Sequence, residues 1–455
     1  MALVISQESY DQVVRENVED LDMSLEEAAQ DAIQQFTAQG VDLGNIITDP
    51  TMRKEAEEEL KGCITRLSDV ENVDLQDDKF GTDLQTIRKW CDKGVPFRLL
   101  AGKLKAYNTL INVLHQHLDV DGKNVPILKT LNSLMTGYPD LLDDAGVEAL
   151  VSIISTSRNV DTLAAALRMI QTCCLKHEKN RQKFANKEIH DIIHSLLEHP
   201  DCSCFLIEIC EVIKALTLDD DIREQISRAH EHARLLAVNN LCKLCELLGI
   251  YKNDTDIVPY ILGALSSIVV RNEFCEKVDQ AGGIIHILDI LAAHPDIERV
   301  NAQCLRMIKV LAGNDDVKSH LMHSGASPLL LAAMSRHKGS SLISSAGCSC
   351  IAALALRSPE NAQILVDNGA ADAIIDALKI HKTGNVQRVA SLAIRNVVSR
   401  NKQLCSAFIS LGVEDLLNSV DKAACWDEAK AALRDLGCKV KLDEPFKGKG
   451  IKLEN

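Results

Sequence analysis

The stretch NDDVKSHLMHSGA, residues 314–326, decides the fold, because related stretches recur at residues 360–370 and 400–413. Each copy runs from a polar segment to a glycine that is followed by Ala or Val. Self-similarity at a fixed period of tens of residues is the sequence signature of a repeat array. The glycines keep this register at intervals of 43, 44 and 43 residues, namely Gly282, Gly325, Gly369 and Gly412.

Each repeat predicts three helices. An Asn or Asp can cap a short first helix, and the glycine permits a tight break before a second helix such as residues 284–291. A longer third helix follows, as in residues 386–399. Upstream, Gly102 and Gly146 also differ by 44 residues and extend the register. Such a unit cannot bury its apolar faces alone, so we expect about eight units to stack between residues 86 and 440.

The repeats resemble the armadillo family in the capping Asn, the glycine before the second helix and the phrase AIRNV at residues 393–397. The resemblance is weaker at residues 179–270, where the glycine is missing and AHEHAR at 229–234 interrupts the register. It implies an all-α, right-handed armadillo-repeat solenoid. It also implies that the third helices line a concave groove, which in this family usually holds an extended peptide or a partner helix.

The same resemblance supplies the candidate site. It places the groove Asn of the family at Asn396, but the other third helices lack Asn there, and Trp90 and Trp426 are the only tryptophans. A receptor for nuclear-localisation signals is therefore disfavoured. One position earlier the third helices carry five basic residues, namely Arg168, Lys214, Arg306, Arg395 and Arg434.

These cations have two interpretations. If they face the groove, as the corresponding position does in β-catenin, they form a strip that binds the carboxylates of an acidic extended or helical partner segment. Alternatively, they are solvated residues whose stems cover apolar neighbours.

Charge divides the chain unevenly. Residues 1–80 contain 20 acidic and 6 basic side chains, whereas the remainder contains 45 and 44. The neutral remainder disfavours nucleic acid as a partner. We expect an acidic N-terminal arm at 1–80, with short amphipathic helices and a linker from about residue 46, then the solenoid at 86–440 and a polar tail at 441–455. Residues 1–80 could also occupy the cationic strip until a partner displaces them.

Composition narrows the class of function. Apolar runs are too short for a membrane helix, and the first residues do not read as a secretory leader. Sixteen cysteines scattered through apolar helical patterns favour reduced, buried thiols and a cytoplasmic protein, with the nucleus as an alternative location. No phosphate-binding loop, nucleophile elbow or zinc-binding helix appears. We therefore expect a non-enzymatic protein-binding scaffold without cofactor or metal.

Two alternative functions stay open. A cofactor of Hsp70-type chaperones is one, and a metal- or ligand-dependent enzyme is a less favoured one. HisProAsp occurs at 199–201 and 294–296, where loop chemistry explains it better than a J-domain does. The insertion around His230 and His232 is either a charge-paired, lengthened first helix or a second partner surface sensitive to histidine protonation.

Overall fold

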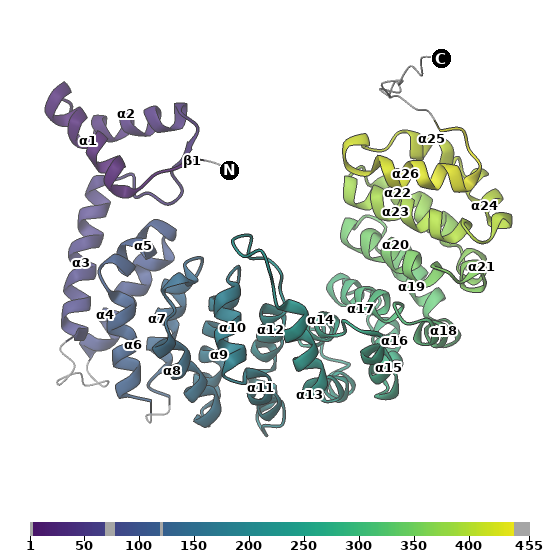
Figure 1. The fold of residues 1–455 in the computed structure, drawn as a ribbon, viewed down its shortest axis with the longest axis horizontal. Helices are drawn as coiled ribbons and strands as arrows, with labels where there is room; N and C mark the ends of the chain where they lie inside the picture. Colours follow the sequence, from purple (N-terminus) through teal and green to yellow (C-terminus); the bar gives the residue numbers. More distant parts are fainter. Residues whose placement is uncertain (1–2, 69–77, 119–121, 441–455) are drawn as a thin grey trace, which may run out of the picture. The chain divides into compact units, whose positions relative to one another are not determined.

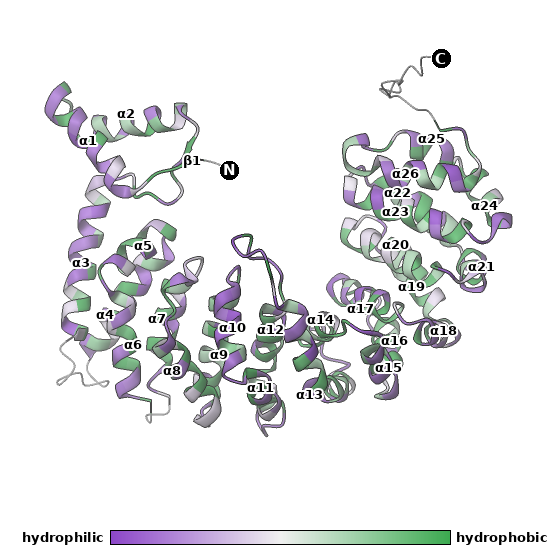
Figure 2. Cartoon of the chain, in the orientation of Figure 1, coloured by the Kyte–Doolittle hydropathy of each residue, from purple (hydrophilic) through white to green (hydrophobic). Residues whose placement is uncertain are grey.

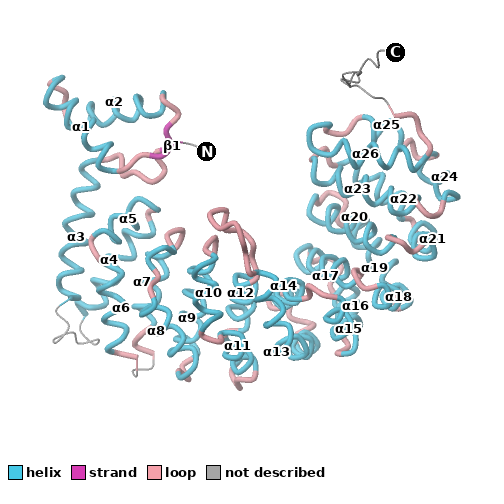
Figure 3. The backbone as a smooth tube through the Cα atoms, viewed as in Figure 1, coloured by secondary structure: helices cyan, strands magenta, loops and turns pink. Residues whose placement is uncertain are grey.

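The computed structural model describes residues 3–68, 78–118 and 122–440. Within these ranges the chain folds into 26 α-helices and one short parallel sheet, in which β1 (Leu3–Val4) pairs with β2 (Val41–Asp42) (Figure 3). No helix in these ranges has both the length and the apolar character needed to cross a bilayer. The chain divides into two compact units, Met1–Asn239 and Asn240–Asn455. The expected all-α solenoid is confirmed.

The first unit begins with α1 (Gln7–Leu21) and α2 (Leu25–Ala38), which pack against each other. The predicted capping box is present, because Ser24 Oγ accepts from the backbone N–H of Glu27 and the Glu27 carboxylate accepts from the N–H of Ser24. Apolar residues of both helices and of the loop after β2 form a small core: Tyr10, Val14, Ala28, Ala29, Ala32 and Ile46.

The expected linker is instead mostly helical, since α3 spans Pro50–Ser68. Its apolar residues recur at helical spacing and are buried against α4 (Asp78–Asp92), α5 (Val95–Lys103) and α6 (Ala106–Gln116). Polar pairs join α3 to α4 as well. The indole N–H of Trp90 donates to Glu59 (2.7 Å), and Arg66 forms an ion pair with Asp83 (2.5 Å). The acidic residues of α3 thus belong to the helical stack, and α4 runs across the predicted start of the solenoid.

The repeats of the first unit follow α4. Their bounds are α5 (Val95–Lys103), α6 (Ala106–Gln116) and α7 (Val125–Met135); the 3-10 helix η2 (Pro139–Leu141), α8 (Asp144–Thr156) and α9 (Val160–Cys174); and α10 (Glu178–Asn186), α11 (Ile189–Leu197), η3 (Cys202–Cys204) and α12 (Leu206–Leu216). The third helices α7, α9 and α12 pack side by side, with α4 against α7 (Figure 1). The predicted register is visible in this order of helices.

The fourth repeat differs from the others. A single helix, α13 (Ala229–Ile250), replaces the first two helices and is followed by α14 (Val258–Ile268). The interrupted register around residues 229–234 therefore marks the start of one long helix, which replaces two helices where a lengthened first helix was expected. The boundary between the two units falls within α13.

The second unit contains the four regular repeats. Their bounds are α15 (Asn272–Gln280), α16 (Gly283–Ala293) and α17 (Glu298–Leu311); α18 (Asp315–His323), α19 (Ala326–Arg336) and α20 (Ser341–Ala355); α21 (Pro359–Asp367), α22 (Ala370–Ile380) and α23 (Gly384–Val398); and η4 (Lys402–Leu404), α24 (Cys405–Ile409), α25 (Val413–Asn418) and α26 (Lys422–Leu436). The third helices α14, α17, α20, α23 and α26 pack in sequence. Hydrophobic and hydrophilic residues are interspersed along these helices (Figure 2).

Caps and breaks explain the repeat. Asn314 caps α18 by accepting from the N–H groups of Asp316 and Val317, as predicted. The glycine before each second helix of the regular repeats adopts a positive φ, for example +98° at Gly369. The upstream pair was misassigned. Gly102 and Gly146 lie inside helices, and Lys105 and Glu188 instead supply left-handed residues before α6 and α11.

Gly146 is needed for a different reason. A Cβ at this position would collide with the hydroxyl of Tyr107, which donates to Asp143 (2.7 Å). Close packing of α6 on the start of α8 therefore fixes this glycine, and its spacing from Gly102 carries no information about the turn.

Candidate protein-binding groove

The five basic residues expected to form a strip all lie on third helices. Arg168 is on α9 and Lys214 on α12, in the first unit. Arg306, Arg395 and Arg434 lie on α17, α23 and α26, in the second unit. Each is at least partly exposed to solvent. The units differ in what surrounds these charges.

In the first unit the cations are already neutralised. Arg168 donates to the carboxylate of Glu208 on α12, with its Nη2 at 2.5 Å and its Nε at 3.0 Å from the same oxygen. The Lys214 ammonium lies 2.6 Å from Glu211 on its own helix. An acidic partner would have to compete with these carboxylates.

The acidic arm does not supply those partners. Among its described side chains, Asp11 pairs with Arg53 and Glu8 pairs with Lys103 of α5. Arg168 and Lys214 pair with acids of α12. Within the first unit the described residues of the arm therefore contact the body at α4, α5 and α6 and form no ion pair with the cationic strip.

In the second unit Arg395 lies near Asp435 of α26, with 3.6 Å between Nε and Oδ2. One amide hydrogen of Asn396 is committed to the carbonyl of Ala352 on α20 (2.9 Å). Within residues 240–440, Arg306 and Arg434 form no ion pair. Of the five predicted basic residues, Arg306 is the one that shares a groove with other basic side chains.

Arg306 lies in a groove of about 570 Å³ over the third helices α17, α20 and α23. Lys309 of the same helix and Arg388 of α23 lie in it as well. Neither of these two makes an ion pair with a described residue, and no carboxylate lines the groove. The lining residues are Arg306, Lys309, Ser341, Leu342, Ser345, Ala346, Ser349, Thr383, Asn385, Val386, Arg388 and Val389.

Comparisons with known proteins agree with this architecture. A family model described as Armadillo repeat-containing protein 6 N-terminal domain matches residues 2–62, and the model described as ARMC6 matches residues 66–454. The chain belongs to the armadillo repeat-containing protein 6 family.

Relatives of this family span most of the chain. An armadillo repeat-containing protein 6 homolog of Drosophila melanogaster is 35% identical over 376 residues, which cover 81% of each protein. Armadillo repeat-containing protein 6 of Homo sapiens is 32% identical over 380 residues, or 79% of this chain and 75% of the human protein. The fold is similar to that of an engineered protein with a solved crystal structure, at a TM-score of 0.66 and 16% identity, covering 94% of this chain and 98% of that one. These matches establish an armadillo-repeat protein.

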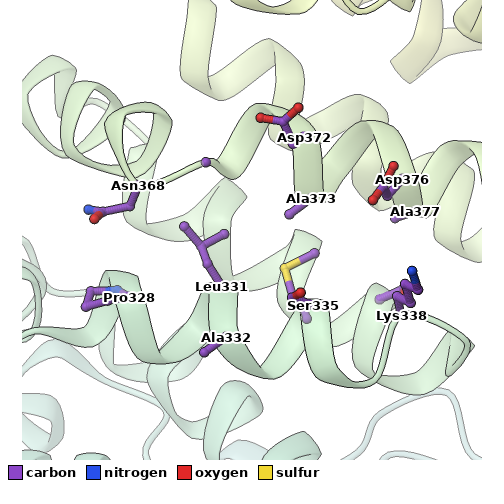
Figure 4. A pocket seen from close by; sticks show the side chains of 13 residues that line it. Pro328, Leu331, Ala332, Ser335, Lys338, Asn368, Asp372, Ala373, Asp376 and Ala377 are labelled. Carbon is purple, nitrogen blue, oxygen red and sulfur yellow. The ribbon is translucent and has the colours of Figure 1, made fainter.

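The second unit of this armadillo repeat-containing protein 6 family member has another hollow, of opposite charge (Figure 4). It lies between α19 and α22 and has a volume of about 420 Å³. Asp372 and Asp376 project from α22 on one side, and Lys338 follows α19 on the other. Its two carboxylates would repel an acidic segment, so the two hollows of this unit suit different ligands.

The first unit uses charge to fix a loop. Arg181, which is fully buried, pairs with Glu178 (3.1 Å) and Asp220, and it donates to the carbonyl of Leu218 (2.7 Å). Hydrogen bonds from Arg223 and the backbone N–H of Glu178 hold the pKa of Asp221 well below its usual range. This network ties the connection after α12 to α10.

The histidine motifs are parts of the local structure. His232 is buried, and its Nδ1 lies 3.1 Å from the carbonyl of Leu216. His294 of the second HisProAsp segment bonds the carbonyl of Lys252 (3.0 Å). In the described residues, no group of three or more His, Cys, Asp or Glu side chains is arranged to hold a metal ion.

The sixteen cysteines are free thiols, and most are buried. Burial raises the pKa of the Cys245 thiol to about 12, so this thiol stays protonated at neutral pH. The arrangement is that of helix-core cysteines.

Lys309 and Arg388 were missed by aligning equivalent positions of the repeats. Arg388 lies nearly two turns before Arg395 on α23, yet it is Arg388 that shares the groove with Arg306. Successive repeats of a solenoid are rotated relative to each other, so a groove crosses the third helices diagonally. A search for cations at shifted positions in third helices one or two repeats apart could have found Lys309 and Arg388.

Proposed function

We propose that this chain is a non-enzymatic scaffold that binds an acidic, extended segment of a partner protein in the groove over α17, α20 and α23. Arg306, Lys309 and Arg388 would contact the carboxylates of the segment. The supporting observation is that these three cations share one groove in which no carboxylate neutralises them. The opposite charge of a partner contributes most binding energy at charged side chains that have no ion-pair partner within their own fold.

The other predicted contacts take lesser roles in this proposal. Arg434 makes no ion pair with a described residue and could extend the contact on α26. Arg168, Lys214 and Arg395 already have acidic neighbours, and Asn396 has committed one amide hydrogen. A surface ion pair is worth only about 0–1 kcal/mol, so a partner could still displace one of them.

The test uses a labelled peptide of alternating Glu and Ser and measures its binding to the full chain by fluorescence anisotropy. Arg388→Glu should weaken binding at least about tenfold, because like charges across an interface cost several kcal/mol. Lys379→Glu is the matched control, since Lys379 is exposed on α22 outside the groove and the change in net charge is the same.

Equal losses in the two variants would contradict the proposal, because they would indicate attraction by overall charge alone. A peptide of alternating Lys and Ser should not bind the groove. Raising the salt concentration should weaken binding of the Glu peptide more for the parent chain than for the Arg388→Glu variant.

The proposed location is the cytoplasm, with the nucleus as the alternative, because sixteen free cysteines suit a reducing compartment. Fluorescence microscopy of the tagged full chain tests this proposal. Accumulation in the secretory pathway would contradict it.

A further inference from the structure

Between its cations, the groove carries a row of hydroxyl groups. Ser341, Ser345 and Ser349 recur every four residues on α20 and therefore share one face of that helix. Thr383 precedes the first residue of α23 and lines the same groove, and its side chain makes no capping hydrogen bond. Arg306 and Lys309 lie on one side of this row and Arg388 on the other, because α17 and α23 flank α20.

The hydroxyl hydrogens of this row are not used within the described part of the chain. Ser345 Oγ accepts a hydrogen bond from the amide of Asn385 (2.9 Å), which leaves its own hydrogen to be donated elsewhere. On the next third helix, by contrast, the hydroxyl of Ser391 donates to the carbonyl of Gln387 (2.8 Å). Ser345 and Ser349 donate to no such carbonyl, although both are half-buried in the groove.

This donor set exceeds what one carboxylate can use. A carboxylate brings one negative charge and two oxygens, whereas a phosphoryl group on Ser or Thr brings a charge of about −1.5 to −2 and three strong acceptor oxygens. Two arginines, one lysine and two hydroxyls with an unused hydrogen match a phosphoryl group better than they match a carboxylate. No carboxylate lines the groove to repel a doubly charged group, and no aromatic ring lines it to stack a nucleic-acid base.

We propose that the groove selects a segment phosphorylated on Ser or Thr, with Arg306, Lys309 and Arg388 neutralising the phosphoryl group and Ser345 and Ser349 donating hydrogen bonds to it. This inference rests on the proposed function, because it specifies which acidic segment the groove prefers. The flanking carboxylates of the segment would contact the remaining length of the groove.

The test compares three labelled peptides that are identical except for a central phosphoserine, Glu or Ser. With the full chain, the phosphoserine peptide should bind about tenfold more tightly than the Glu peptide. This preference should shrink as the pH falls below about 6, where the phosphate loses its second charge. A single-stranded oligonucleotide should compete poorly with the phosphoserine peptide.

The Ser345→Ala/Ser349→Ala double variant tests the hydroxyl groups. Alanine is favourable in a helix, so the fold should be retained, and circular dichroism checks it. The preference for phosphoserine over Glu should fall severalfold, while binding of the Glu peptide stays within about twofold of the parent. Arg388→Gln should instead weaken the binding of both the phosphoserine peptide and the Glu peptide.

The outcomes separate the two proposals. Equal affinity for the phosphoserine and Glu peptides would overturn the preference for phosphate and leave the acidic groove intact. Failure of both peptides to bind would overturn the proposed function itself. Stronger binding of the oligonucleotide than of the phosphoserine peptide would favour nucleic acid and overturn the inference.

Discussion

The third helices of the two units carry cations at equivalent repeat positions but surround them differently. In the first unit the Arg168 guanidinium forms an ion pair with Glu208 of the next third helix, and the Lys214 ammonium forms one with Glu211 of its own helix. In the second unit Arg306 shares a groove with Lys309 and Arg388, and no carboxylate lines it. The repeat position of a cation therefore does not decide its role. The acids that surround it, on its own helix or on a neighbouring one, decide that role.

The same contrast extends to buried charge. The first unit buries Arg181 and Glu178 almost completely and uses them to fix the connection after α12. A buried ion pair is a weak source of stability, but removing one partner leaves the other charge without compensation. We infer that charge in the first unit serves mainly the fold, whereas charge in the groove of the second unit is available to a partner.

The largest expected effect is that of Arg181→Ala. It removes the partner of the buried Glu178 carboxylate and should lower the free energy of unfolding by about 3–5 kcal/mol. Denaturant titration measures the loss, and hydrogen exchange should locate it in α10 and α12. Binding of the Glu–Ser peptide to the second unit should be unchanged at temperatures where the variant stays folded.

Arg223→Ala is the matched control for this substitution. Arg223 pairs with Asp140 and Asp221 at the same loop, but its side chain is 48% exposed. The Arg223–Asp140 pair is exposed, and the buried side chain of Asp221 keeps its hydrogen bond from the backbone N–H of Glu178, so the loss should be smaller than that of Arg181→Ala. Equal losses for the two variants would show that the loop does not depend on the buried charge.

An intermediate effect concerns the turn before the second helix. In the second unit Gly369 adopts a φ of +98° with no neighbour near its missing Cβ, so Gly369→Ala should cost about 1 kcal/mol through backbone strain alone. In the first unit Glu188 holds the equivalent turn at a φ of +56°. Glu188→Gly should therefore stabilise the chain by up to about 1 kcal/mol.

Thermal unfolding of the two variants measures both shifts. Stability changes of opposite sign would support one shared turn geometry. The second unit forms this turn with a glycine, and the first unit forms it with a strained residue. If Glu188→Gly were destabilising instead, a contact of the Glu188 side chain or the greater entropy of glycine in the unfolded chain would outweigh the relief of backbone strain.

Sequence predicted the repeat but not the whole helical stack. The glycine register was decisive because a left-handed residue before a second helix is nearly specific to glycine, as at Gly325. It failed at Glu188, where the turn persists without glycine. The sequence also did not predict α3, in which the small buried Ala56 lies among the acids Glu55, Glu57, Glu58 and Glu59, so the segment was interpreted as a linker.

The candidate site was predicted in part. Arg306 was found because it recurs at a fixed repeat position, and Lys309 and Arg388 were missed because the groove crosses the helices at shifted positions. Periodicity also cannot tell a free cation from a paired one. The partner of Arg168 lies 40 residues away on the next third helix, so its neutralisation appears only once α9 and α12 pack together.

The smallest expected effect tests whether charge alone separates the two units. Glu208→Gln keeps a side chain that can accept from Arg168 but removes the negative charge that neutralises it. In an Arg388→Glu background, which weakens the groove of the second unit, this change should raise affinity for the Glu–Ser peptide about twofold to threefold, because a surface pair is worth about 0.2–1 kcal/mol. Anisotropy titration at low salt resolves a change of this size.

A gain in affinity would mean that the carboxylates of the first unit prevent acidic segments from binding there. No gain would mean that the shape of its third helices excludes the peptide, and that the two units differ in more than their charges.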